Sequence, residues 1–235
     1  MLNTVICCVD YDDFLSLTLP VNMLVLPRPG RITVLTAPWD RRTRSLALEH
    51  GADVFATTAW RENGMFNKAR ALNEWLRHVR TTQNCGWVLM LDADIILPRD
   101  LFLEWERLVS DTLYGARRRM CLSESDWLEF SAGRRKMESF PTADLPIIDG
   151  RVWGKCPTGN PAALSGYFQL WNCTLESAPK HLVEFPTAAE YDVYFALQFA
   201  ERQRLFLPGV EVLHLGHPRI NWRGRQTERW QPGSA

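Results

Sequence analysis

The first hundred residues alternate between short apolar runs and segments with helical periodicity. Four apolar runs predict strands at residues 4–9, 31–37, 53–57 and 86–91. Amphipathic segments between and after them predict helices at residues 14–24, 41–52, 67–80 and 101–109. This alternation predicts an α/β fold in which helices flank a central, mostly parallel sheet.

The second half of the chain is less regular. Further strands are predicted at residues 117–123, 166–172, 204–208 and 210–217. A helix is predicted over 187–203, because Thr187 followed by Glu190 forms a capping box. Segment 124–165, rich in Gly, Pro and charge, is expected to cross the ligand-binding edge of the sheet. The length of 235 residues suits a single domain, 1–235.

Two carboxylates interrupt the apolar run "VLMLDADIILP" at residues 88–98, where Asp92 and Asp94 follow a buried strand. Burying a carboxylate without a partner is costly, and Mg²⁺ or Mn²⁺ bound through one or two carboxylates plus phosphate removes that cost. The simpler interpretation is a pair of solvated loop carboxylates. Asp10 and Asp40 also follow predicted strands, and ligands of open α/β sheets bind outside the carboxyl ends of the strands.

Composition adds few constraints. The formal net charge is zero, which gives no general argument for binding to nucleic acid or to an acidic membrane. No apolar run reaches the ~20 residues of a membrane span, and the first residues lack the basic start of a signal peptide. The six cysteines contain no CxxC pair, and Cys7 and Cys8 lie in a predicted strand. We therefore expect reduced cysteines and a cytoplasmic protein.

Four stretches resemble nucleotide-sugar glycosyltransferases of the GT-A fold, near family 2 and its phage-type relatives. They are "TAPWD", "FNKARALNEWL", "WVLMLDADIILP" and "VLHLGHPRINWRGR". The resemblance covers roughly residues 4 to 225. It implies a GT-A domain with a nucleotide-sugar-binding half, 1–98, and an acceptor-binding half, 99–235, which ends in a basic, aromatic tail.

The resemblance implies a UDP-sugar donor and a Mn²⁺ or Mg²⁺ cofactor. For the donor, Asp40 would bind the base, Asp10 would lie near the nucleoside, and Lys68 or Arg70 would lie near the diphosphate. For the metal, Asp94 would be the direct ligand, Asp92 would hold ribose or metal-bound water, and either His214 or His217 would be a further ligand.

An inverting enzyme of this fold needs a general base for the acceptor hydroxyl. The resemblance places it at a helix start, where Asp192 is the first candidate and Glu190 the second. Asp192 could instead favour the helix dipole, and Glu190 the capping box. Tyr191 separates the two acids, unlike the family pattern, so the stereochemical outcome is left open. The candidate acceptor-binding residues are Gly166, Tyr167, Trp171 and Trp153.

The sequence thus predicts metal-dependent transfer of a hexose to an acceptor hydroxyl. Arginine clusters with nearby tryptophans suit phosphate contact and base stacking, so one acceptor is a hydroxymethylated base in DNA; the clusters are 41–44, 117–119, 133–136 and 219–225. The alternatives are a soluble glycan or a protein. A nucleotidyltransferase would carry a Gly-rich phosphate loop where "DYDDF" stands. A non-catalytic nucleic-acid or carbohydrate-binding module is a further alternative.

Overall fold

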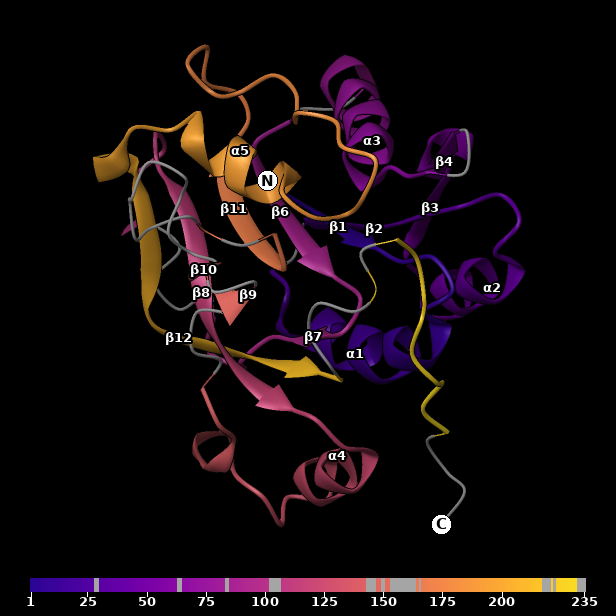
Figure 1. Cartoon of the computed structure of the whole chain (residues 1–235). Coiled ribbons are helices and arrows are strands. Elements are labelled where there is room, and N and C mark those ends of the chain that lie inside the picture. The colour runs from indigo at the N-terminus through magenta and orange to yellow at the C-terminus, as the bar shows by residue number, and fades with distance from the viewer. Residues whose placement is uncertain are drawn as a thin grey trace.

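The apolar runs of the chain form one eight-stranded sheet of order β3-β2-β1-β6-β11-β8-β12-β7 (Figure 1). The computed structural model describes residues 1–27, 30–62, 65–82, 85–101, 107–142, 147–148, 151–152, 164, 166–216, 221 and 223–231. The strands of this sheet are β1 Leu2–Cys7, β2 Gly30–Thr36, β3 Asp53–Ala56, β6 Trp87–Asp92, β7 Ile95–Ile96, β8 Leu113–Cys121, β11 Phe168–Asn172 and β12 Arg204–Leu215. Two small hairpins accompany it, β4 Arg61–Glu62 with β5 Met65–Phe66 and β9 Ile147–Ile148 with β10 Arg151–Val152.

The sheet has a parallel half and a mixed half. Strands β3, β2, β1 and β6 pair in parallel, so their carboxyl ends lie at one edge. Strand β11 then runs antiparallel to β6 and β8, whereas β12 runs parallel to β8 and antiparallel to β7. The predicted α/β fold with helices on both faces is confirmed.

Helices bury both faces of the sheet. The α-helices are α1 Asp12–Val25, α2 Arg41–Glu49, α3 Lys68–Thr82, α4 Glu124–Ser131 and α5 Tyr191–Leu197. One core packs α3 and α5 on one face, through residues such as Trp75, Trp171 and Phe195. The other core packs α1 and α2 on the opposite face, through residues such as Leu15, Leu19 and Ala47. Strands covered on both faces are continuously apolar, as β6 is.

Helix α1 carries two buried polar side chains that hold the segment after β6. The hydroxyl of Thr18 donates to the carbonyl of Ala93 at 2.6 Å. The amide of Asn22 donates to the carbonyl of Ile95 at 2.7 Å and accepts the N–H of Leu97 at 2.9 Å. These bonds satisfy backbone groups that the short strand β7 leaves unpaired, and they fix the turn that contains Ala93.

Several predicted elements need correction. Helix α5 begins at Tyr191 rather than 187, and Glu190 at its N-cap makes no side-chain capping bond, so the predicted capping box is wrong. The two late strands are one strand, β12, with a bulge between Phe206 and Glu211. Segment 124–165 begins with helix α4, whose N-cap Ser123 accepts the N–H of Asp126. Most of the predicted helix 101–109 lies outside the described residues.

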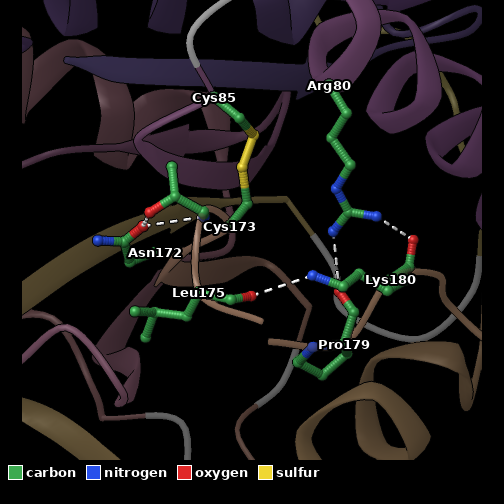
Figure 2. The surroundings of a disulfide bond; sticks show 8 residues. Arg80, Cys85, Asn172, Cys173, Leu175, Pro179 and Lys180 are labelled. Carbon is green, nitrogen blue, oxygen red and sulfur yellow. Dashed lines mark hydrogen bonds between the residues drawn. A yellow bond between two sulfur atoms is a disulfide. The ribbon is translucent and has the colours of Figure 1, made fainter. Parts of the chain in front are cut away.

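A disulfide joins Cys85, just before β6, to Cys173, just after β11 (Figure 2). Beside it, Arg80 of α3 donates to the carbonyl of Pro179 at 2.9 Å and to that of Lys180. Cys7, Cys8 and Cys121 are free and buried, as expected of Cys7 and Cys8, but the expectation that all cysteines are reduced is wrong. Because disulfides are rare in the cytosol, the cysteines give no support to a cytoplasmic location. Among the described residues, no helix has the length and apolarity to cross a bilayer.

The contacts of Asn22 lead to a stability prediction. Asn22→Leu leaves the carbonyl of Ile95 and the N–H of Leu97 buried without partners, which costs roughly 2–4 kcal/mol in the free energy of unfolding. Urea denaturation measures this loss. As a control, Leu24→Ala on the same helix, where the side chain is 88% exposed, changes stability by less than about 0.5 kcal/mol. Equal stability of the two variants would contradict the assigned role of Asn22.

Candidate active site

Four aspartates gather at the carboxyl edge of the parallel strands, as the sequence indicated. Asp92 is the last residue of β6, and Asp94 lies in the turn between β6 and β7. Asp10 follows β1 and Asp40 follows β2, and the backbone N–H of Asp10 donates to Asp40 Oδ2 at 2.7 Å. The fold therefore brings side chains from three strand ends to one edge of the sheet.

Asp92 is paired with Lys68, the first residue of α3. Lys68 Nζ donates to Asp92 Oδ1, and the Lys68 side chain is only 10% exposed. Burial alone would lower the pKa of Lys68, but Asp92 and Tyr191 raise it well above its usual value. Lys68 is thus a fixed ammonium group beside the first acid of the D-x-D motif. Arg70 lies one residue further on, where its N–H is held by Asn67 Oδ1 at 2.9 Å.

Asp94 faces His214 from strand β12. His214 pairs with Ile95 of β7, and its Nε2 lies 3.2 Å from Asp94 Oδ2. On the other side of the ring, Arg118 Nη1 lies 3.3 Å from His214 Nδ1. Burial would raise the pKa of Asp94, but His214 and Lys68 lower it below its usual value. The second oxygen, Asp94 Oδ1, is buried and has no hydrogen-bond partner among the residues that the structure describes.

Asp40 and Asp10 have well-defined contacts. Asp40 is the N-cap of α2: its Oδ1 accepts the N–H of Thr43 at 3.2 Å, while its Oδ2 accepts the N–H of Asp10. Asp10 has a φ of 60°, and its carboxylate lies 4.0 Å from Arg61, whose guanidinium lies 5.6 Å from the ring centre of Trp39. Asp40 is buried, and Asp10 is the more exposed of the two carboxylates.

Asp192 lies in the first turn of α5. Its Oδ2 accepts the N–H of Gly166 at 2.5 Å and its Oδ1 accepts its neighbour Val193 N–H at 2.9 Å. Burial raises the pKa of Asp192 although these N–H groups lower it. A Cβ atom at Gly166 would lie 2.6 Å from the Asp192 Cβ and 2.7 Å from the Tyr191 hydroxyl. Gly166 thus makes room for the chain's own helix α5, although it was predicted to be an acceptor-binding residue.

The predicted acceptor aromatics have different environments. Trp171 is fully buried and packs edge-on against Phe195 with ring centres 4.9 Å apart, so its prediction as an acceptor-binding residue is wrong. Tyr167 stacks on the His214 ring, 6.3 Å between centres, and Arg118 lies 4.6 Å from the Tyr167 ring centre. Trp153 and His217 lie outside the described residues. Glu190 is exposed and has a φ of 73°.

Two tyrosines at the site were not identified from the sequence. The ring of Tyr191 lies 5.4 Å from Lys68 Nζ, and within the described part of the chain its buried hydroxyl has no hydrogen-bond partner. Burial raises the pKa of Tyr11 well above its usual value, and the nearby carboxylates Asp94 and Asp92 raise it further. Tyr11 lies in "DYDDF" among acidic residues, and Tyr191 lies between the two acids Glu190 and Asp192. In both places the acids, and not the ring, suggested a function.

Four of the described arginines in the predicted basic clusters form ion pairs with acids of the chain. Arg119 bonds Glu211 at 2.5 Å, Arg134 bonds Glu129 at 2.8 Å and Arg135 bonds Asp126. Arg225 forms a buried ion pair with Asp13 at 2.5 Å. These four guanidinium charges are balanced within the chain, so these four arginines are not the free phosphate-binding groups that the sequence suggested.

Comparison with known proteins identifies the fold. No family model matches the chain. A peptidyl serine alpha-galactosyltransferase of Arabidopsis thaliana is 27% identical over 106 residues, which are 42% of this chain and 13% of that protein. The chain therefore spans a small part of this curated relative.

Solved structures resemble nearly the whole chain. A mannosyltransferase of Pyrobaculum calidifontis, in complex with GDP-Man and Mn²⁺, has a TM-score of 0.56 at 17% identity, over 91% of this chain and 56% of that one. S. aureus TarS 1-349 with UDP-GlcNAc has a TM-score of 0.58 at 11% identity, over 94% and 60%. The chain has the GT-A fold of nucleotide-sugar glycosyltransferases, and it spans less than two thirds of these two structures.

The pairing of Lys68 with Asp92 can be tested by stability. Lys68→Met leaves the Asp92 carboxylate without its cation, which costs on the order of 3 kcal/mol in the free energy of unfolding. The double variant Lys68→Met/Asp92→Asn regains most of that loss, because no unpaired charge remains. Denaturant unfolding of both, with exposed Arg77→Met on the same helix as a control, measures the coupling. Additive losses in the double variant would refute it.

Proposed function

We propose that the protein is a metal-dependent glycosyltransferase that moves a hexose from a UDP-sugar to an acceptor hydroxyl. The observation that carries the proposal is the pair formed by Asp94 and His214, with an unpartnered Asp94 oxygen, at the carboxyl edge of the sheet. The GT-A fold supports it, because ligands of open α/β sheets bind at this edge. Glycosyltransferases that have this fold also include structures with bound UDP-GlcNAc or with GDP-Man and Mn²⁺.

The donor would lie over the ends of β1, β2 and β6. The exposed Asp10 carboxylate and the Arg61 guanidinium offer a hydrogen-bond acceptor and donors to a nucleobase, and Trp39, 43% exposed, offers a stacking face. Asp40 would act on the base through the loop of Asp10, whose N–H it holds. The cation of Lys68, with Arg70 close in sequence, supplies positive charge on the diphosphate side.

The chemistry of the residues fits a divalent cation. Asp94 and His214 would hold Mn²⁺ or Mg²⁺, since carboxylate and imidazole are both suitable ligands for Mn²⁺. Such a cation, when bound, offsets the charge that develops on the diphosphate leaving group. The described residues contain no group of three metal-ligating side chains, so the remaining positions would belong to water, the diphosphate or His217, which is not described. Asp92, held by Lys68, would face ribose or metal-bound water.

Asp192 is the candidate general base for the acceptor hydroxyl. Its two oxygens are fixed by backbone N–H groups, and each carboxylate oxygen has a second lone pair for a further bond. Glu190 is the second candidate, but it lies exposed at the N-cap. Tyr167, stacked on His214, would lie between the donor and acceptor sides.

The paired arginines favour a protein or glycan hydroxyl as the acceptor over a hydroxymethylated base in DNA. Binding to DNA depends on cations that are free to replace phosphate counterions, and Arg119, Arg134, Arg135 and Arg225 are bound to acids of this chain. The curated relative is named for transfer to peptidyl serine, which is a protein hydroxyl. Nucleoside diphosphate release, stimulated by serine peptides, simple glycans or hydroxymethylated DNA in parallel assays, separates these acceptors. A purely binding module would release none.

Removing the metal ligand tests the proposal most directly. Asp94→Asn should bind Mn²⁺ at least about tenfold more weakly and lower nucleoside diphosphate release from UDP-sugar by about a hundredfold or more, because the neutral amide is a poor ligand. Calorimetric Mn²⁺ titration and the release assay measure the two effects. Glu190→Gln serves as a control for metal binding. Unchanged Mn²⁺ affinity in Asp94→Asn would rule out this metal site.

The role of Asp192 predicts a pH dependence. Since burial raises its pKa, the carboxylate needed as a base is lost at a higher pH than for an ordinary aspartate, and transfer should rise as pH increases through the raised pKa. Asp192→Asn should lower kcat by about 10²–10⁴-fold and remove this rise, with donor binding retained. The pH profile of kcat for both proteins measures the effect. An unchanged profile in Asp192→Asn would exclude Asp192 as the base.

A further inference from the structure

Arg225 in the C-terminal tail is the most completely bound arginine of the site. Its side chain is only 9% exposed, and the tail runs beside α1 (Figure 1). A guanidinium has five N–H donors, and here each has an acceptor. The bonds run from Nε to Thr227 O (3.0 Å), from Nη1 to Asp10 O (3.0 Å) and Asp13 Oδ1 (2.5 Å), and from Nη2 to Asp13 Oδ2 (2.7 Å) and Glu228 O (2.6 Å).

This arginine holds one side of the Asp10 peptide, and Asp40 holds the other. Asp40 accepts the Asp10 N–H at 2.7 Å, and Arg225 donates to the Asp10 carbonyl at 3.0 Å. Asp10 has a φ of 60°, a left-handed conformation that residues other than glycine keep only when the surroundings hold them in it. The two hydrogen bonds keep Asp10 in this conformation. The Asp10 side chain is 42% exposed and lies beside Arg61.

Arg225 also seats the ring of Tyr11. The guanidinium lies 4.9 Å from the centre of that ring, which is a cation–π contact. The tail thus contacts two consecutive residues after β1: the carbonyl of Asp10 and the ring of Tyr11. Arg229 and Trp230 extend the contact, since Arg229 bonds Asp12 and the Trp230 N–H donates to Asp13 Oδ2 at 2.8 Å.

We propose that Arg225 is a positioning residue of the donor site: it holds Asp10 and Tyr11 in the conformation that receives the nucleotide, so that docking of the tail completes the site. This inference rests on the proposed function. It replaces the earlier expectation that the arginines of 219–225 contact phosphate, because no N–H of Arg225 remains for a phosphate. Arg225 acts through the loop and does not touch the reacting atoms.

The test uses the full chain with Arg225→Lys, and with Arg223→Lys as the matched control, since Arg223 lies in the same tail and is exposed. Lysine keeps the positive charge but cannot form the planar fork, so one ammonium cannot hold both Asp13 and the Asp10 carbonyl in the same way. We expect UDP to bind on the order of tenfold more weakly to Arg225→Lys and the donor KM to rise similarly, with kcat at saturating donor within about threefold. Arg223→Lys should leave all three values near those of the unaltered protein.

Amide hydrogen exchange gives a readout that does not depend on the donor. Exchange of the Asp10 to Asp12 amides should accelerate in Arg225→Lys and not in Arg223→Lys. Unchanged exchange, or an equal effect of the control, overturns the role of Arg225. Failure of the unaltered protein to bind UDP contradicts the proposed function instead.

A second variant covers the case in which Arg225→Lys does not fold. Asp13→Asn/Arg225→Gln replaces the buried ion pair by a neutral pair and leaves no charge without a partner. It should fold, bind UDP on the order of tenfold more weakly and show the same faster exchange at Asp10 to Asp12. Wild-type UDP affinity in this folded variant would overturn the proposal.

Discussion

The organisation of this protein depends on how two carboxylates at the end of a buried strand are neutralised. Asp92 and Asp94 follow the apolar strand β6, where an ionised group without a partner would be strongly destabilising. Lys68 from α3 forms an ion pair with Asp92, and His214 from β12 contacts Asp94. Lys68 belongs to the helix that precedes β6 of the parallel half, and His214 belongs to the mixed half of the sheet. The charge requirement therefore joins the two halves at this point.

The two partners leave the two acids in different states. Lys68 is a buried ammonium whose pKa is raised by Asp92, so Asp92 is held by a permanent charge. His214 contacts one Asp94 oxygen, and the other oxygen is buried without a hydrogen-bond partner among the described residues. An unsatisfied buried oxygen is costly unless something binds it, which favours Asp94 over Asp92 as the proposed metal ligand. The difference arises from the partners rather than from the acids themselves.

The sequence was informative where a residue breaks a pattern. Asp92 and Asp94 could be located because they interrupt an apolar run, and the parallel strands then placed Asp10 and Asp40 at the same edge. The sequence could not tell whether Trp171 binds the acceptor or fills the core. Strand β11 is covered on both faces, and aromatic residues in such a strand give the same sequence pattern in either role.

Long-range pairings were beyond the reach of sequence patterns. Arg225 looks like a free cation in a basic tail until its partner Asp13 is found, 212 residues earlier. The Cys85–Cys173 pair, separated by 88 residues, carries no local spacing signal either. The start of α5 was misplaced because Thr187 and Glu190 match a capping box in sequence, while Glu190 takes a positive φ and Tyr191 turns inward toward Lys68.

Gly166 and Tyr167, in the turn that precedes β11, connect the candidate base Asp192 to the D-x-D motif by hydrogen bonds. The Gly166 N–H donates to Asp192, and the next carbonyl, that of Tyr167, accepts the Asp92 N–H at 3.1 Å. A side chain at position 166 would meet Asp192 and Tyr191, so only glycine lets α5 approach this closely. Asp192 is thus positioned relative to Asp92 by two hydrogen bonds to backbone groups of this turn, rather than by long flexible side chains. That constraint would keep the acceptor base in fixed register with the donor site, which in-line attack by an acceptor hydroxyl requires.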